Sequence, residues 1–140
     1  MSRFVLDNNV TMAWCFTEEA TEFTKTLLNR LSNLTDSAIV PVLWLYEVVN
    51  VVELAFRKGR ITSEKADAFL DSLADLPIVV ENPSRAQVTV TVRALAGQHR
   101  LTSYDAAYLE LAIRHKLPIA SLDAALLKAA SAAGVDTIQT

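Results

Sequence analysis

Four carboxylic acids in this sequence, Asp7, Glu47, Asp105 and Asp123, stand in settings where their charges need an explanation. Glu47 is the most informative, because it interrupts the apolar run VPVLWLYEVVNVV at residues 40–52, which predicts a largely buried helix. Burying a lone carboxylate is costly unless it is paired, protonated or bound to a cation. No Lys or Arg lies within one helical turn of Glu47 in the sequence. A metal ion is therefore the leading explanation for this residue.

Short β-rich runs alternate with helical patterns along the chain. The runs predict five strands, at residues 3–6, 38–40, 78–80, 118–122 and 135–138. One of the helical patterns is expected to begin at Pro41, in its first turn, and to end at Gly59 as a C-cap. Strands that alternate with helices predict βαβ crossovers. We therefore expect an α/β fold with a mostly parallel sheet that is covered by helices on both faces.

All four acids are expected at the same edge of this sheet. Asp7 and Asp123 directly follow strands, Glu47 lies one to two turns into the helix after the second strand, and Asp105 begins the helix before the fourth strand. These positions all face the carboxyl ends of the strands, where open α/β sheets bind ligands. Helix capping is the alternative explanation for Asp7, Asp105 and Asp123, because acids are common at helix starts. It does not explain Glu47, which lies well inside its helix.

Clustered carboxylates repel each other, so protons or a cation must join them. Oxygen ligands with no His or Cys nearby in the sequence favour Mg²⁺ or Mn²⁺ over Zn²⁺. A Mg²⁺ ion held by a few carboxylates typically acts on phosphate esters. The sequence contains neither of the Gly-rich nucleotide-binding patterns, G-x-x-x-x-G-K-[ST] and G-x-G-x-x-G. Three polar neighbours of the acids are candidates for support or substrate binding: Asn9, Asn50 and Ser121.

Composition bounds the fold and the compartment. The chain has 140 residues, 51% of them hydrophobic, with three glycines and four prolines, which predicts one folded domain over residues 1–140. Cys15 is the only cysteine, which excludes an internal disulfide and indicates a reducing compartment. We expect neither a signal peptide nor a transmembrane helix, and hence a cytoplasmic protein without a membrane partner. The net charge of −3 argues mildly against duplex nucleic acid as a ligand.

Four segments of the chain resemble the PIN-domain ribonucleases, specifically the VapC-type toxins of type II toxin–antitoxin systems. They are FVLDNNV at residues 4–10 with Ala13 and Trp14, PVLWLYEVVNV at 41–51, LTSYDAAYLELA at 101–112 and PIASLD at 118–123. The resemblance implies a three-layer α/β/α fold with a five-stranded parallel sheet of order 3-2-1-4-5. It also implies a Mg²⁺- or Mn²⁺-dependent endoribonuclease.

The same resemblance implies roles for individual residues. Asp7 and Asp105 look like principal metal ligands, and Glu47 and Asp123 look like direct or water-mediated ones. Ser121 occupies a position that is typically Ser or Thr. The family further implies a homodimer, together with a cognate antitoxin whose C-terminal segment covers the active-site groove.

Asn9 departs from the family pattern, because it stands where the family often has Ser or Thr. The departure concerns the role of Asn9 and leaves the acidic set intact.

We therefore interpret the sequence as that of an endoribonuclease that hydrolyses RNA phosphodiester bonds, with a metal-activated water, and as the toxin of a toxin–antitoxin pair. The alternative is a catalytically weak or inactive PIN-fold module that binds a partner protein. Retention of all four acids and of Ser121 favours the enzyme. Phosphatase chemistry through an aspartyl-phosphate is disfavoured, because it would use an Asp-x-Asp pattern near the first strand, where this chain has Asp7-Asn8-Asn9.

Overall fold

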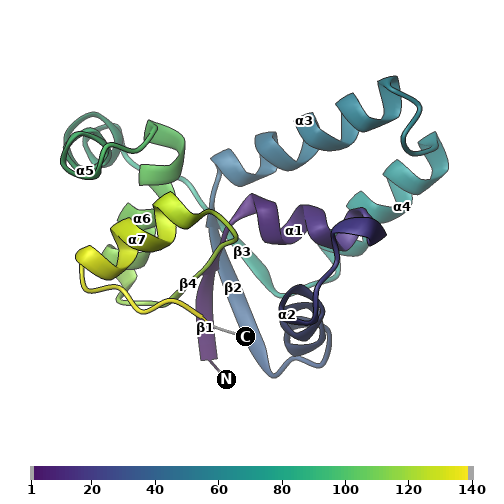
Figure 1. Cartoon of the computed structure of the whole chain (residues 1–140), viewed down its shortest axis with the longest axis horizontal. Helices are drawn as coiled ribbons and strands as arrows, with labels where there is room; N and C mark the ends of the chain where they lie inside the picture. The colour runs from purple at the N-terminus through teal and green to yellow at the C-terminus, as the bar shows by residue number, and fades with distance from the viewer. Residues whose placement is uncertain (1, 139–140) are drawn as a thin grey trace.

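The computed structural model describes residues 2–138, and a parallel sheet lies at its centre (Figure 1). Four strands form the sheet in the order β3-β2-β1-β4. They are β1 (Ser2–Leu6), β2 (Asp36–Pro41), β3 (Ile78–Glu81) and β4 (Ile119–Ala120). All three pairings are parallel, as the alternation of strands and helices predicts.

The expectation of five strands was wrong, because residues 135–138 do not form a ladder. They make a single parallel bridge between Ile119 and Thr137. Its hydrogen bonds run from Ile119 N to Asp136 O, at 2.9 Å, and from Ile138 N to Ile119 O, at 3.0 Å. β4 is itself two residues long, so it offers few main-chain groups to a further strand. The expected order is confirmed for the four strands, and the bridge lies on the side of β4 where the fifth was expected.

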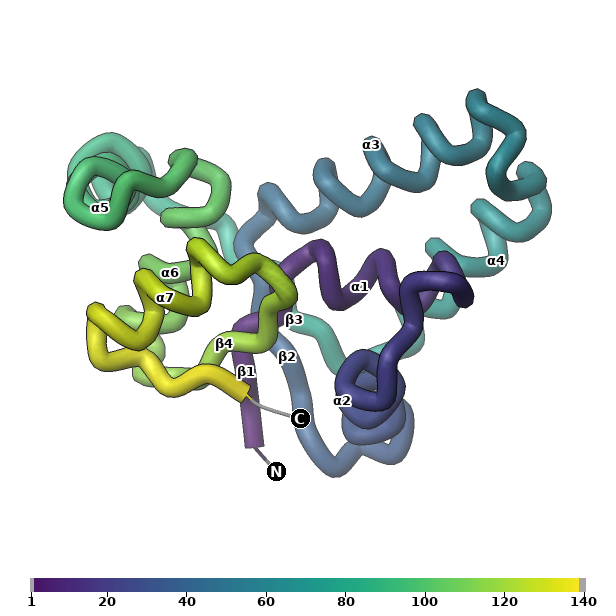
Figure 2. Tube along the Cα trace, in the orientation of Figure 1, coloured from purple at the N-terminus to yellow at the C-terminus, as the bar shows by residue number. Residues whose placement is uncertain are grey.

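Helices cover both faces of the sheet. They are α1 (Asn8–Cys15), α2 (Glu22–Ser32), α3 (Leu43–Arg57), α4 (Ser63–Ala74), α5 (Arg93–His99), α6 (Ser103–His115) and α7 (Ala124–Ala132). A 3-10 turn, Thr17–Glu19, precedes α2, and a π-helical segment, Gln87–Val92, leads into α5. Figure 1 shows α1 to α4 on one side of the sheet and α5 to α7 on the other, which is the expected three-layer arrangement. In Figure 2, α3 and α4 form a hairpin that projects beyond the sheet.

None of the helices within residues 2–138 is both long and apolar enough to span a membrane.

The two central strands form the middle of the core. Residues 4–6 of β1 and 38–40 of β2 are all buried, and such continuous apolar runs are typical of a parallel sheet that is covered on both faces. On one face α6 packs against β1 and β2, and on the opposite face α2 packs against β2 (Figure 1). This packing fixes α6, the helix that carries Asp105, against the centre of the sheet.

The start of α3 differs from the expectation. Pro41 is the last residue of β2, where it pairs with Glu81, and it does not lie in the first turn of the helix. A proline has no N–H, so at the end of a strand it removes only one hydrogen-bond donor from the sheet. The expected end of the helix is confirmed, because Gly59 follows α3 with a φ of +73°, which a glycine adopts without strain.

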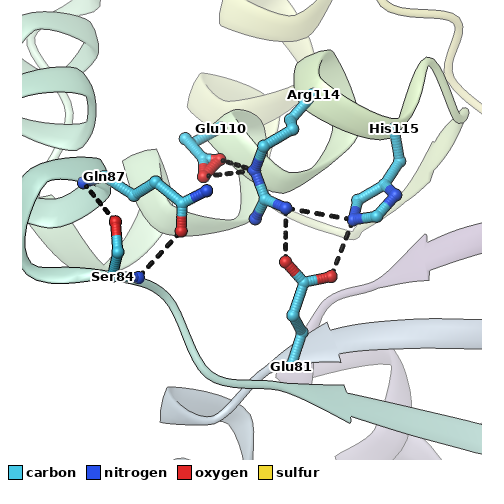
Figure 3. A network of polar contacts seen from close by, with 6 residues as sticks. All are labelled: Glu81, Ser84, Gln87, Glu110, Arg114 and His115. Atoms are coloured by element: carbon cyan, nitrogen blue, oxygen red, sulfur yellow. Dashed lines mark hydrogen bonds and ion pairs between the residues drawn. The ribbon is translucent and has the colours of Figure 1, made fainter.

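The C-terminal end of α6 is attached to the end of β3 by charged side chains (Figure 3). Arg114 Nε donates to both carboxylate oxygens of Glu110, at 3.0 and 3.1 Å, and Arg114 Nη1 pairs with Glu81. His115 Nε2 lies 2.7 Å from the second oxygen of Glu81. Glu110 is buried, and Arg114 supplies the partner that a buried carboxylate needs. The network holds the end of α6 that is opposite to Asp105.

Candidate active site

The four predicted acids lie on four elements that meet at the carboxyl ends of the strands. Asp7 joins β1 to α1, and Glu47 lies in the second turn of α3. Asp105 lies in the first turn of α6, and Asp123 is the N-cap residue of α7. Figure 1 shows α1, α3 and α7 starting from this edge of the sheet. The topology therefore brings carboxylates from distant parts of the chain to one edge.

Asp7 is the most buried of the four acids, with 5% of its surface exposed. Burial raises the pKa of Asp7 to about 7, although hydrogen bonds from the Ser121 hydroxyl and the Asn8 backbone oppose the rise. The charges of Asp105 and Glu47 raise this pKa further. The side chain of Asp7 makes no capping hydrogen bond at the start of α1. Helix capping, the alternative explanation, therefore does not account for Asp7.

The hydroxyl of Ser121 joins Asp7 to the start of α7. Ser121 Oγ donates to Asp7 Oδ2 at 2.7 Å and accepts the backbone N–H of Asp123 at 3.0 Å. The side-chain amide of Asn9 also donates to Ser121 Oγ, at 3.4 Å. A hydroxyl has one hydrogen to donate, and its other two partners here are donors, so the Ser121 hydrogen points to Asp7. Asn9 Oδ1 in turn accepts the N–H of Leu122 at 3.0 Å.

Asn9 and Ser121 thus share one function in the fold. Together they tie the connection between β1 and α1 to the connection between β4 and α7. The departure of Asn9 from the family pattern is accommodated, because its amide bonds to both Ser121 and the Leu122 backbone.

Glu47 is half-buried, and its hydrogen-bond partner was missed in the sequence. The hydroxyl of Tyr108 donates to Glu47 Oε1 at 2.6 Å. Burial raises the pKa of Glu47, the hydrogen bond from Tyr108 opposes the rise, and the charge of Asp105 adds to it. A signal was present: Tyr108 follows Asp105 by three residues on the same face of the helix, and a buried tyrosine needs a partner for its hydroxyl.

Asp105 and Asp123 interact through their carboxyl groups. Partial burial raises the pKa of Asp105, and Asp123 raises it further by its charge and by a side-chain hydrogen bond. Both residues also belong to helix starts. The Thr102 hydroxyl accepts the N–H of Asp105 at 3.1 Å, and Asp123 Oδ1 accepts the N–H of Ala125 at 3.0 Å. Capping is therefore confirmed for Asp123, where it uses one of the two carboxylate oxygens.

Asn50 is exposed and takes no part in the hydrogen bonds around Asp7. It lines an open hollow of about 480 Å³ beside α3, together with Tyr46, Glu47, Val49 and Glu53. The three-residue spacing from Glu47 to Asn50 predicts this shared face. Asn50 and Glu47 therefore face the same hollow.

The chemistry of the four side chains fits a hard divalent cation. All of them offer carboxylate oxygens, and the groups that shift the pKa values of Asp7, Glu47 and Asp105 include no Lys, Arg or His. The charges of Asp7, Glu47 and Asp105 act on one another, and the charge of Asp123 acts on Asp105. Among residues 2–138, no three Asp, Glu, His or Cys side chains are arranged to hold a metal ion. The ligand set stays a prediction, and one ion shared by three acids requires their side chains to move.

Comparisons with solved structures show the same fold in three other proteins. PAE2754 from Pyrobaculum aerophilum is 19% identical over 91% of this chain and 84% of that chain, with a TM-score of 0.70. FitAcB from Neisseria gonorrhoeae is 18% identical over 97% of this chain and 96% of that chain, with a TM-score of 0.66. VapBC2 from Rickettsia felis, bound to a DNA fragment from their promoter, is 13% identical over 97% of each chain, with a TM-score of 0.67.

The sequence comparisons give the family. No curated protein sequence matches the chain. A sequence model of the PIN domain matches residues 4–132. These residues include all four acids and both strands that pair with β1, namely β2 and β4. The chain therefore belongs to the PIN domain family.

Proposed function

We propose that this protein is a Mg²⁺- or Mn²⁺-dependent endoribonuclease that acts as the toxin of a toxin–antitoxin pair. The observation that carries the proposal is the group of four acids at one sheet edge. Three of them have raised pKa values, and no basic group is among the causes. A divalent cation would remove the repulsion within such a group. PIN domains are generally nucleases, and this acidic group lies inside the matched residues 4–132.

The proposed roles follow from the resemblance to the VapC-type toxins. Asp7 and Asp105 would be the principal metal ligands, and Glu47 and Asp123 would bind the ion directly or through water. The chemistry that Mg²⁺ or Mn²⁺ supplies at such a site is polarisation of the phosphodiester and activation of a water nucleophile. Cleavage would leave 5′-phosphate and 3′-hydroxyl ends.

Three polar residues would support the acids. Ser121 holds Asp7 through its hydroxyl, and Asn9 holds the backbone next to Ser121. Asn50, exposed in the hollow beside α3, is the candidate to contact the RNA.

A partner protein is part of the proposal. The similarity to VapBC2 agrees with the resemblance of the sequence to VapC-type toxins, and it supports an antitoxin as the partner. We also propose that residues 1–140 act as one domain, that the protein is a homodimer, and that it works in the cytoplasm. The last point rests on the single cysteine.

The alternative function, a protein-binding module with weak or no catalysis, has one observation in its favour. An apolar hollow of about 300 Å³ lies between α3, α4 and β3 and is lined by residues such as Trp44, Val48, Leu73 and Ile78. Hollows of this kind accept apolar side chains of a partner. A toxin that binds an antitoxin also needs such a surface, so activity decides between the two functions.

Cleavage of RNA by the purified protein tests the proposal. Total cellular RNA should be cut with Mg²⁺ or Mn²⁺ and left intact with excess EDTA, and mapped products should carry 5′-phosphates. Asp7→Asn and Asp105→Asn should each abolish cleavage while the far-ultraviolet circular dichroism spectrum is retained. Asp71→Asn, on the exposed face of α4, is the matched control and should cut like the wild type. Full activity in EDTA, or in the Asp7→Asn protein, would refute the nuclease mechanism.

A further inference from the structure

We infer that Tyr108 is a positioning residue for Glu47, because its hydroxyl fixes one carboxylate oxygen and leaves the other for a metal ion or its bound water. The inference rests on the proposed function of the acidic group. Tyr108 Oη lies 2.6 Å from Glu47 Oε1, although the residues are 61 positions apart in the chain. An ionised carboxylate has no hydrogen to give, so Tyr108 is the donor.

The tyrosine is itself held firmly. Tyr108 is fully buried, with 0% of its surface exposed, and its ring lies within the apolar core cluster. The single hydroxyl hydrogen is donated to Glu47. The hydroxyl on α6 thus holds the side chain of Glu47 on α3.

This hydrogen bond joins two helices that each carry an acid. Glu47 lies on α3, and Asp105 lies three residues before Tyr108 on α6. Glu47 has a long side chain that is only half-buried, and such a side chain is freely mobile without a partner. The hydrogen bond restricts that freedom at Oε1 and leaves the other oxygen, Oε2, for a metal ion or its bound water. Partners of this kind orient metal ligands in many proteins, and their removal typically lowers metal affinity by about 10- to 100-fold.

The alternative explanation is purely structural: a buried hydroxyl needs a hydrogen-bond acceptor. The two explanations differ in what Tyr108→Phe does. A purely structural hydroxyl would affect stability and leave the affinity for Mn²⁺ unchanged. A positioning hydroxyl affects metal affinity, and it does so through Glu47.

Binding of Mn²⁺ to the full chain, measured by isothermal titration calorimetry at constant pH, tests the inference without reference to activity. Tyr108→Phe keeps the buried ring, and we expect it to weaken Mn²⁺ binding by about 10-fold or more. Glu47→Gln should weaken binding as well, and adding Tyr108→Phe to Glu47→Gln should cause no further loss, because the residues act as a unit. Tyr104→Phe removes the hydroxyl of an exposed tyrosine on the same helix and should bind Mn²⁺ like the wild type.

A second variant covers the case in which Tyr108→Phe fails to fold. Glu47→Asp keeps the charge but is one methylene too short to reach the hydroxyl, and its half-buried position does not threaten the core. It should lose affinity to a similar degree. Wild-type affinity in Tyr108→Phe or in Glu47→Asp would overturn the inference, as would an equal loss from Tyr108→Phe in the wild-type and Glu47→Gln backgrounds. No Mn²⁺ binding by the wild type would overturn the proposed metal site itself, and the inference with it.

Discussion

Ser121 Oγ lies 2.7 Å from Asp7 Oδ2, although the two residues are 114 positions apart in the chain. Their contact spans the paired strands β1 and β4, which end side by side. Burial disfavours the charged form of Asp7, and the hydrogen bond from the Ser121 hydroxyl is the largest influence that favours it. The same hydroxyl accepts the N–H of Asp123. Ser121 therefore couples the charge of one acid to the position of another.

Replacing Ser121 by Ala should have two effects. The pKa of Asp7 should rise further, which weakens Mn²⁺ binding at pH 7. The free energy of unfolding should fall by about 1–3 kcal/mol, because the N–H of Asp123 and the amide of Asn9 lose their acceptor. Urea unfolding and Mn²⁺ titration measure the two effects. Ser121→Thr retains the hydroxyl and should preserve most of the Mn²⁺ affinity and of the free energy of unfolding. Equal losses of these two quantities in the Thr and Ala variants would show that the hydroxyl is not responsible.

The raised pKa of Asp7 should make the stability of the metal-free protein depend on pH. The ordinary pKa of this carboxyl is 3.8, and in the folded protein it is about 7. The folded state therefore holds the proton more tightly than the unfolded state does. The resulting stabilisation is complete below about pH 4 and is lost as the pH rises through about 7. Glu47 and Asp105, whose pKa values are also raised, act in the same direction.

Asp7→Asn removes this titration and so isolates it. In EDTA, the stability of Asp7→Asn relative to the wild type should increase between about pH 4 and pH 8, by at most about 4 kcal/mol. Urea unfolding at several pH values measures the difference. Asp71→Asn, exposed on α4, should show no such trend. A difference that stays constant over this range would contradict a raised pKa of Asp7 in the folded protein.

The arrangement of the strands could be predicted from sequence, with one exception. Apolar runs in alternation with helical patterns gave the positions of β1 to β4, and the resemblance gave their order. The run at residues 135–138 has the apolar character of a strand, but pairing depends on the neighbour as well. β4 has two residues in the ladder, and no local pattern in residues 118–122 reveals how few of them pair.

The site was predictable in its acids and less so in their partners. The edge on which the acids lie follows from strand direction and helix order alone. The contact between Tyr108 and Glu47 depends on how α3 and α6 sit against each other, which neither segment encodes by itself. Whether three acids converge on one ion depends on the rotamers of their side chains, which likewise no single segment encodes by itself.

Mg²⁺ or Mn²⁺ should raise the melting temperature, because an ion that binds the folded protein stabilises it by mass action. The acids that repel one another when empty gain a shared counter-charge. Glu47→Gln should reduce the increase, and Glu64→Gln, on the exposed start of α4, should leave it unchanged. Differential scanning calorimetry with millimolar Mn²⁺ and with EDTA gives both values. A melting temperature indifferent to Mn²⁺ would count against the site.

We predict a homodimer, from the resemblance and from the high apolar content of so small a chain. The exposed apolar side chains Leu45, Tyr46 and Val49 on α3 agree with that prediction. Self-association removes such surface from water. Size-exclusion chromatography with light scattering at micromolar concentration should give about twice the 15.4 kDa chain mass. A monomer at every concentration tested would refute the prediction.

The proposed antitoxin should contact the acids directly. A site lined by carboxylates attracts cations, and an arginine from the partner would pair with them while an apolar helix covers the neighbouring surface. The bound complex should therefore be inactive, and its affinity should fall when Asp7 and Asp123 are both replaced by Asn. The measurement is the affinity of the protein encoded beside this one for the wild type and for the double variant. Asp67→Asn with Asp71→Asn, on α4, is the control of equal charge. Equal affinities for wild type and the Asp7 and Asp123 double variant would show that the antitoxin blocks RNA sterically, and no binding at all would favour a nuclease that acts alone.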